Sequence, residues 1–246
     1  HNFAPDRAAA EQVIKLVPDV PLVARANRAF LRRAVNFLLA EGVTQFLDLG
    51  SGIPTVGNVH EVAQEAHPGA RIVYVDIDPV AVTHSAALLK DNPTATVIQA
   101  DARKPETILG HPEVQRLLDF RQPMAVLMLA FLHFVTDDEE AETLVRGMRD
   151  ALAPGGYIAI SHALSDAATR LNVSREMVEK GTEMYRRTTN PVRLRSRAQI
   201  ERYFEGLQLV EPGLVDIPLW RPEGPDDIFF DTPARASVLA GVGRKP

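Results

Sequence analysis

The sequence of 246 residues contains no cysteine, which excludes disulfide bonds, thiolate zinc sites and cysteine nucleophiles together. No apolar run approaches the roughly 18 residues that a membrane span needs, so we expect no membrane partner. Positive charge is also scarce: 27 Lys and Arg against 32 Asp and Glu leave a net charge of −5, which does not attract nucleic acid. The start of the chain carries no signal-peptide pattern, and we therefore expect a cytoplasmic location.

What the chain does have is a regular alternation of apolar strand patterns with amphipathic helix patterns. Two helices come first, and strand and helix then alternate five times, which predicts a parallel sheet with helices on both faces. The expected strands are 44–49, 71–75, 96–99, 125–129, 157–161, 207–211 and 237–241. The expected helices are 6–16, 21–40, 58–66, 79–90, 112–118, 136–152 and 196–204.

We predict a single domain over residues 1–246, because no repeat, low-complexity tract or linker interrupts the chain. The fold class is α/β, with a Rossmann-like, doubly wound and mostly parallel sheet of seven strands. Within it we expect an N-terminal helical cap at 1–42, a ligand-binding core at 43–163, a helical lid insertion at 164–203 and C-terminal strands at 204–246.

Two strands of this core end in a carboxylate beside a turn. Residues 46–52 read FLDLGSG and residues 73–79 read VYVDIDP, so Asp48 and Asp76 belong to one βαβ unit. Glycines in the first turn let the backbone approach a ligand closely. The second acid can hold a ribose, because a carboxylate only accepts hydrogen bonds and both ribose hydroxyls donate. The unit therefore predicts a site for a nucleotide-like ligand.

Two ligand classes use this arrangement. A dinucleotide fingerprint, Gly-x-Gly-x-x-Gly, needs a third glycine where this chain has Thr55, and Asp48 is foreign to that pattern. We therefore disfavour an NAD-type dehydrogenase. A strand that reads hydrophobic-Asp-hydrophobic-Gly-x-Gly resembles instead the first motif of the class I methyltransferases that depend on S-adenosylmethionine (SAM). The expected fold is then the class I methyltransferase fold.

This resemblance implies roles for the residues at the strand ends. The glycine turn would pass under the amino acid portion of SAM, Asp76 would bind the ribose, and Asp101 would face the adenine, although Asp is also a common turn former. Arg28 either pairs with the SAM carboxylate or is a solvated surface arginine. Asn58 and His60 either touch the methionine moiety or, for Asn58, only cap a helix. The candidate cofactor-binding residues are Asp48, Gly50, Ser51, Gly52, Asp76, Ile77, Asp101, Ala102, Arg28, Asn58 and His60.

Longer segments make the resemblance more specific. LDLGSGIPTVGNVHEVAQ, VYVDIDPVAV, VLMLAFLHFV and ALAPGGY together resemble the bacterial "S-adenosyl methyltransferase" family, long described as a domain of unknown function. The likeness spans nearly the whole chain and includes residues 26–35. It implies the fold and the binding of SAM, with S-adenosylhomocysteine (SAH) as product. It implies almost nothing about the acceptor.

Two histidines are candidates for the chemistry. Methyl transfer is an in-line displacement in which positioning matters most, and a hydroxyl acceptor benefits from a base with a pKa near 7. His133 and His162 follow strands 125–129 and 157–161 and are placed for that role, or each is a structural histidine bound to a carbonyl. No metal is expected, because His111 and His162 lack carboxylates at ligand spacing.

The function we predict is SAM-dependent methyl transfer to a small-molecule acceptor, by O- or N-methylation. The absence of cysteine excludes cytosine C5 methylation through a thiolate, and residues 128–131 lack the motif of amino-methylating DNA enzymes. We expect no nucleic acid partner. The alternative is a catalytically silent protein that binds SAM or SAH as a sensor or partner subunit, because no acceptor-specific motif is present.

Overall fold

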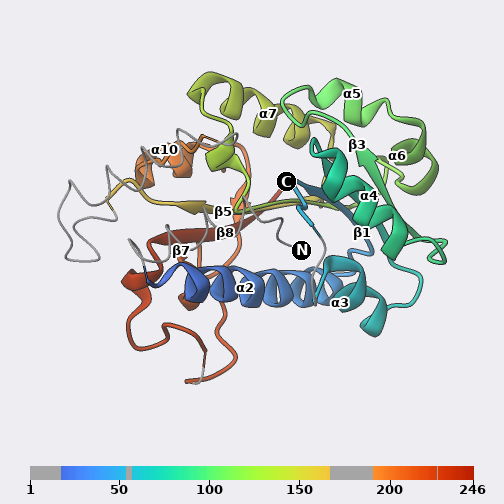
Figure 1. Cartoon of the computed structure of the whole chain (residues 1–246). Coiled ribbons are helices and arrows are strands. Elements are labelled where there is room, and N and C mark those ends of the chain that lie inside the picture. Colours follow the sequence, from blue (N-terminus) through green and yellow to red (C-terminus); the bar gives the residue numbers. More distant parts are fainter. Residues whose placement is uncertain (1–17, 54–56, 167–190, 226) are drawn as a thin grey trace.

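The computed structural model describes residues 18–53, 57–166, 191–225 and 227–246 (Figure 1). The expected helix 6–16, most of the expected lid and Thr55 lie outside the described residues. The strands are β1 Gln45–Leu49, β2 Arg71–Asp76, β3 Ala95–Gln99, β4 Ala125–Leu129, β5 Tyr157–Ala163, β6 Gln208–Leu209, β7 Val215–Asp216 and β8 Val238–Arg244. The α-helices are α2 Val20–Ala40, α3 Val59–Ala66, α4 Pro79–Leu88, α5 Pro105–Leu109, α6 Pro112–Leu117, α7 Asp138–Ala151 and α10 Arg197–Arg202.

The strands form one mixed sheet in the order β3-β2-β1-β4-β5-β8-β6, with β7 paired to β8. Strands β1 to β5 run parallel, and β8 is antiparallel to β5, β6 and β7. The chain moves outward from β1 to β3 and then returns to β4 on the other side of β1. Ligands of open α/β sheets bind at such a reversal, beyond the carboxyl ends of the strands. The topology therefore directs attention to the ends of β1 and β4.

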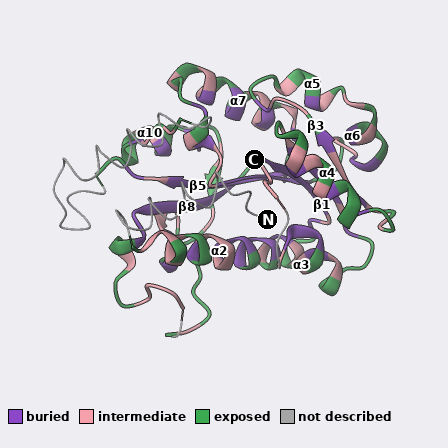
Figure 2. Ribbon diagram, viewed as in Figure 1, coloured by how far each residue is buried: buried purple, intermediate pink, exposed green. Residues whose placement is uncertain are grey.

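Each face of the sheet carries its own apolar core, because successive side chains of a strand point to opposite faces. Leu47 and Leu49 of β1 pack in the cluster that includes α6, α7 and α10. Phe46 packs in the cluster that includes α2 and α3. Figure 1 shows α2 and α3 on one side of the sheet and α5, α6 and α7 on the other, and Figure 2 shows the strands buried between these layers. This confirms the doubly wound α/β fold.

Several boundaries differ from the expected ones. Over the described residues the sheet has eight strands where seven were expected, because the two-residue strand β7 is too short to show an alternating pattern. The helix α5 was not expected at all, since five residues do not complete two turns. The helix α7 begins one residue later than predicted: its N-cap is Asp137, whose side chain accepts a hydrogen bond from the Glu140 N–H, and not Thr136. Both Thr136 and Asp137 fit the capping pattern, and the Asp137 carboxylate makes the capping hydrogen bond.

Candidate active site

A turn with two left-handed glycines follows β1. Gly50 and Gly52 have φ angles of 70° and 64°, which an L side chain rarely adopts. The N–H groups of Gly50 and Ser51 both donate to the Val75 carbonyl, at 2.9 and 3.2 Å. The N–H of Gly52 donates to Oδ2 of Asp76 at 2.7 Å. The turn is therefore tied to the end of β2 by backbone and side chain together.

Asp76 and Asp101 stand at the open rim beyond β2 and β3. Besides Gly52, the carboxylate of Asp76 accepts the Asp78 N–H through Oδ1 at 2.9 Å. Asp101 accepts the N–H of Arg103 and forms a fork with its guanidinium, with contacts of 2.6 to 3.1 Å. The side-chain hydrogen bond from Arg103 holds the pKa of Asp101 below its usual value. Asp101 is thus a turn former in this structure, and it keeps a charge at the rim.

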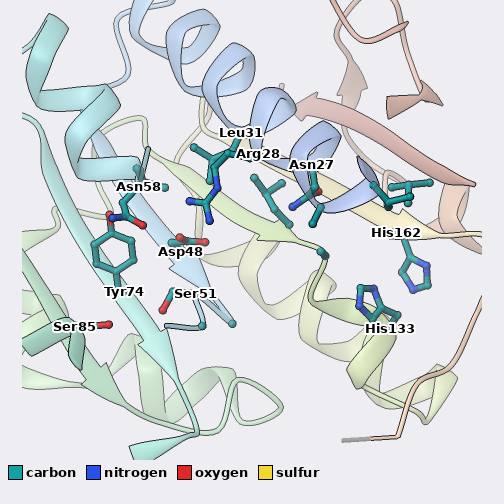
Figure 3. Close-up of a pocket in the computed structure, with 18 of the residues that line it drawn as sticks. Asn27, Arg28, Leu31, Asp48, Ser51, Asn58, Tyr74, Ser85, His133 and His162 are labelled. Carbon is teal, nitrogen blue, oxygen red and sulfur yellow. The ribbon is translucent and has the colours of Figure 1, made fainter. Parts of the chain in front are cut away.

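A cavity of about 430 Å³ opens beneath α2 at the ends of β1, β4 and β5. Figure 3 shows Arg28 and Asp48 in its middle, Asn58 and Tyr74 toward one end, and His133 and His162 at the other. Nine of the predicted residues line it: Arg28, Asp48, Gly50, Ser51, Gly52, Asn58, His60, His133 and His162. The remaining four, Asp76, Ile77, Asp101 and Ala102, do not line it. Of these, Asp76 joins the cavity only through its bond to Gly52, and Ile77 is 57% exposed.

Asp48 is a buried carboxyl group in the middle of this cavity. Burial raises its pKa from 3.8 to about 7; the positive charge of Arg28 opposes the rise and the negative charge of Asp76 adds to it. Arg28 extends from α2 and donates to the Gly57 carbonyl at 3.3 Å. A buried carboxyl group near half ionisation is suited to receive a cation. The cavity therefore has an anion and a cation for the two ends of a zwitterion.

His60 and Asn58 belong to the first turn of α3. The Tyr74 hydroxyl accepts the His60 N–H at 2.8 Å and forms a second hydrogen bond with the Nδ1 atom of His60, also at 2.8 Å. His60 is thereby held against β2. Asn58 is the N-cap of α3, and the Glu61 side chain accepts its N–H at 2.9 Å. The expected capping role of Asn58 is present, and both residues also line the cavity.

The two histidines at the other end are both deprotonated at neutral pH. Burial lowers the pKa of His133 to about 3, with further contributions from His162 and Arg195. Burial also lowers the pKa of His162 to about 4. The His162 ring is bonded through both nitrogens, to the Ala163 carbonyl at 2.7 Å and to Arg195 at 3.1 Å. The Nδ1 atom of His133 is buried and has no hydrogen-bond partner in the part of the chain that the structure describes. Neither histidine has the pKa near 7 that we expected of a base.

Two further residues near the histidine end of the cavity, Asn27 and Arg195, were not predicted. Asn27 on α2 accepts a hydrogen bond from the Ser161 hydroxyl at 2.5 Å, and that hydroxyl accepts the Ala130 N–H at 2.8 Å. Asn27 is a polar residue within the buried stripe Ala26, Phe30 and Leu31, and this exception to the apolar pattern could have marked it. Arg195 gave no such signal, because its partners lie far away in the sequence.

The described part of the chain holds no group of three His, Asp or Glu side chains that could bind a metal ion. Among the described helices, none is long and apolar enough to cross a membrane.

The sheet order and the cavity at its reversal point define an α/β protein of the nucleotide-binding type. Over residues 1–246 the chain matches the model of the S-adenosyl methyltransferase family, and it belongs to that family. It is a SAM-dependent methyltransferase, and SAM is its cofactor. No curated protein sequence matches the chain.

Among solved structures, a candidate methyltransferase from Thermobifida fusca is 42% identical, with a TM-score of 0.89 over 99% of this chain and 89% of that chain. A DUF574 family protein from Streptomyces avermitilis is 36% identical, with a TM-score of 0.91 over 99% and 92%. The N-methyltransferase NodS from Bradyrhizobium japonicum is 16% identical, with a TM-score of 0.54 over 93% and 99%, and shares the fold. These likenesses confirm the predicted family and fold.

Proposed function

We propose that this methyltransferase binds SAM across the carboxyl ends of β1, β2 and β3, and that its acceptor enters at the end of the cavity formed by His133 and His162. The methionine ammonium would meet Asp48 and its carboxylate Arg28. The ribose would be bound by Asp76. The adenine would lie on the exposed side chain of Ile77, beside Asp101 and the Ala102 backbone. The supporting observation is that one continuous cavity runs from Asn58, through Arg28 and Asp48 in its middle, to His133 and His162 at the other end.

The continuity of this cavity supports catalysis rather than silent binding. From the glycine turn the lining runs past Ala130 to His133 and His162. An acceptor at that end would face the glycine turn, over which the sulfonium group would lie. The walls beside it are aliphatic, with Val23, Ala163 and Val238, so that a bound acceptor would exclude water. Such a cavity suits a small organic molecule, and the net charge of −5 does not favour nucleic acid.

The low pKa values of the histidines bear on the atom that is methylated. Hydroxyl acceptors benefit from a base with a pKa near 7, and His133 and His162 lie at about 3 and 4. We infer that the acceptor atom attacks without first losing a proton, as a neutral amine nitrogen does. Its lone pair would form the new bond to the methyl carbon while the carbon–sulfur bond breaks and leaves neutral SAH. The resulting ammonium then releases a proton to water.

A paired substrate screen tests this proposal. Matched amines and alcohols of the same carbon skeleton are incubated with SAM, and SAH release and methylated product are measured. Turnover of amines alone is the expected result. Turnover of alcohols alone would contradict the inference about the acceptor atom.

The placement of the cofactor is tested separately with Asp76→Asn, which keeps the shape of the side chain and removes its charge. SAH affinity should fall by about 1.5–3 kcal/mol, the range for hydrogen bonds to a charged group. Asp78→Asn is the matched control, because Asn also caps helices well and Asp78 caps α4 through the Val80 N–H. Equal affinity of the Asp76 variant and the control would place the ribose elsewhere.

A further inference from the structure

Arg195 is a buried arginine, 1% exposed, between the 132–137 turn and β5. Its Nη1 atom donates to Nε2 of His162 at 3.1 Å and to the Leu132 carbonyl at 2.9 Å. Its Nη2 atom donates to the carbonyls of Val135 and Asp137, at 2.8 and 3.3 Å. Its Nε atom donates to Oδ1 of Asp138 at 3.0 Å. A single guanidinium therefore joins the start of α7, the turn after β4 and the ring of His162.

These contacts fix the tautomer of His162. A guanidinium can only donate, so Nε2 of His162 must carry the lone pair. A carbonyl can only accept, so Nδ1 must carry the proton that is shared with the Ala163 oxygen at 2.7 Å. One neutral tautomer satisfies both partners, and protonation of the ring would break the bond to Arg195. His162 thus has no free lone pair with which to act as a base.

The same arginine holds the turn that carries His133. Three carbonyls of residues 132–137 converge on Arg195, and the N–H of the nearby Arg193 donates to the His133 carbonyl at 2.7 Å. With its backbone held in this way, His133 lines the cavity, and its Nδ1 atom is buried with no hydrogen-bond partner among the described residues. A buried polar atom without a partner is costly, so the position of this ring depends on the contacts that hold the turn.

We propose that Arg195 is a positioning residue of the methyl-transfer site, which locks His162 into one tautomer and holds the 132–137 turn that places His133 in the wall of the cavity. This inference rests on the proposed function for the role of the acceptor, and on the observed contacts alone for the tautomer. Arg195 touches neither ligand and acts through the two histidines.

The charges around the two rings agree with this role. Arg195 faces His162 from the 191–196 segment, Asp138 from α7, Tyr203 from the C-cap of α10 and His133 from the turn. Burial is the main cause of the low pKa of both rings, and the cation of Arg195 lowers both further. Asp138 raises the pKa of His162 but is itself bound by Arg193 and Arg195. Loss of the arginine should therefore make His162 easier to protonate.

Nuclear magnetic resonance of the ¹⁵N-labelled full chain tests the inference without an acceptor, because imidazole nitrogen shifts report tautomer and protonation. A His162→Gln variant assigns the signals. The wild-type protein should show His162 with Nδ1 protonated and Nε2 bare from pH 5.5 to 8. In Arg195→Met, His162 should show mixed tautomers and a titration midpoint higher by about one pH unit or more. Arg193→Met is the matched control: Arg193 binds the same Asp138, does not contact His162, and should leave its signals unchanged.

Two results would overturn the proposal: a wild-type His162 protonated on Nε2, or wild-type His162 signals in a folded Arg195→Met variant. If that variant does not fold, Arg195→Lys replaces it, because one ammonium cannot bind His162 and three carbonyls together. Shifted ring signals of His133 and mixed tautomers of His162 are then expected, and wild-type signals would overturn the proposal. SAH titration of the wild-type protein separates the two claims: absent binding would contradict the proposed function and leave the tautomer measurement valid.

Discussion

Gly50 is constrained by its own backbone and by the ring packed against it. Its φ angle of 70° already disfavours any L side chain. A Cβ atom at this position would lie 2.2 Å from Cδ2 of Phe131, the residue that follows the left-handed Ala130 after β4. The backbone of this turn and the ring of Phe131 are therefore in direct contact at the point where the strand order reverses. Only glycine lets the two loops meet there.

Gly50→Ala should therefore destabilise the protein and weaken SAH binding. We expect a loss of about 2–5 kcal/mol in the free energy of unfolding, the sum of left-handed strain and overpacking. Gly42→Ala is the matched control, because Gly42 has a φ of 84° and open space around it, and should cost about 1–2 kcal/mol from strain alone. Urea denaturation and calorimetric titration measure both effects. Equal losses in the two variants would show that the contact with Phe131 is unimportant.

Asp48 couples ligand binding to pH. Its pKa of about 7 in the free protein means that a proton must leave before the carboxylate can bind the ammonium of SAH. Affinity for SAH should rise with pH by up to about tenfold per unit below pH 7 and level off above it. Titrations from pH 5.5 to 8 measure this, and Asp48→Asn should bind more weakly with a flat profile. A flat wild-type profile would contradict the assignment of Asp48.

The Asp48 carboxyl also affects the stability of the free protein, and its contribution falls as pH rises whereas SAH affinity increases. Because its pKa is higher in the folded protein than in the unfolded chain, the unfolded chain releases the proton first as pH rises. The contribution of Asp48 to the stability of the free protein is therefore present below about pH 4 and is lost as pH rises to about 7.

Residues of this site were predictable from the sequence where a local pattern marks them. Asp48, Gly50 and Gly52 stand next to an apolar strand, and the strand ends of a parallel sheet meet at one edge. Arg195 could not be found in this way, because its partners at 132–138 and 162 come from other elements. The histidines were found by position, but their low pKa values depend on burial, which only the packed structure defines.

At the scale of elements, the cap helix α2 is held by a C-terminal segment that crosses its outer face. The buried Arg33 of α2 donates to the carbonyls of Trp220 and Ile217, at 2.8 and 2.9 Å, and lies 3.5 Å from Asp227. Phe30 and Phe37 of α2 meet the Trp220 ring edge to face. Since α2 carries the cavity-lining residues Asn27 and Arg28, the contacts of this segment with α2 fix the position of the helix above the cavity.

Arg33→Met should destabilise the protein by about 2–4 kcal/mol, because two buried carbonyls and the Asp227 carboxylate lose their donor. Its neighbour Arg32 pairs with Glu223 at the surface, with 52% of its side chain exposed, and Arg32→Met should cost less than about 0.5 kcal/mol. Urea denaturation measures the free energy of unfolding of the two variants. SAH affinity should also fall in Arg33→Met if the segment positions α2, and an unchanged affinity would limit the contact to stability.

The elements with strong periodicity were predicted within a few residues, and β4 at its observed bounds. The errors concern elements whose existence depends on their surroundings. The strand β8 extends to Arg244 because it pairs along the whole length of β5, a contact that no local pattern records. The C-terminal segment around η2 Ile217–Leu219 was not predicted, since Trp220 and Ile217 are buried by packing against α2 and other elements that are distant in the sequence.

At the scale of the whole molecule, the proposed cofactor site is built from both parts of the doubly wound sheet and from the cap. Asp48 and the glycine turn come from β1, Asp76 from β2, Ala130 from the end of β4 and Arg28 from α2. The contacts between these elements hold only when the chain is folded, so a ligand that bridges them binds the folded state alone. Ligand binding and global stability are therefore linked.

SAH at 100 times its dissociation constant should stabilise the protein by about 2.7 kcal/mol, since it binds the folded state only. For a chain of this size that corresponds to a rise of about 5–10 °C in the midpoint of thermal unfolding. NAD at the same concentration should give no rise, because β1 carries Asp48 and the sequence after it lacks the third glycine of a dinucleotide site. Thermal unfolding of the wild-type protein and of Asp76→Asn with each ligand measures this. The variant should need a higher SAH concentration for the same shift, and an equal response to NAD and SAH would contradict the selectivity that the turn predicts.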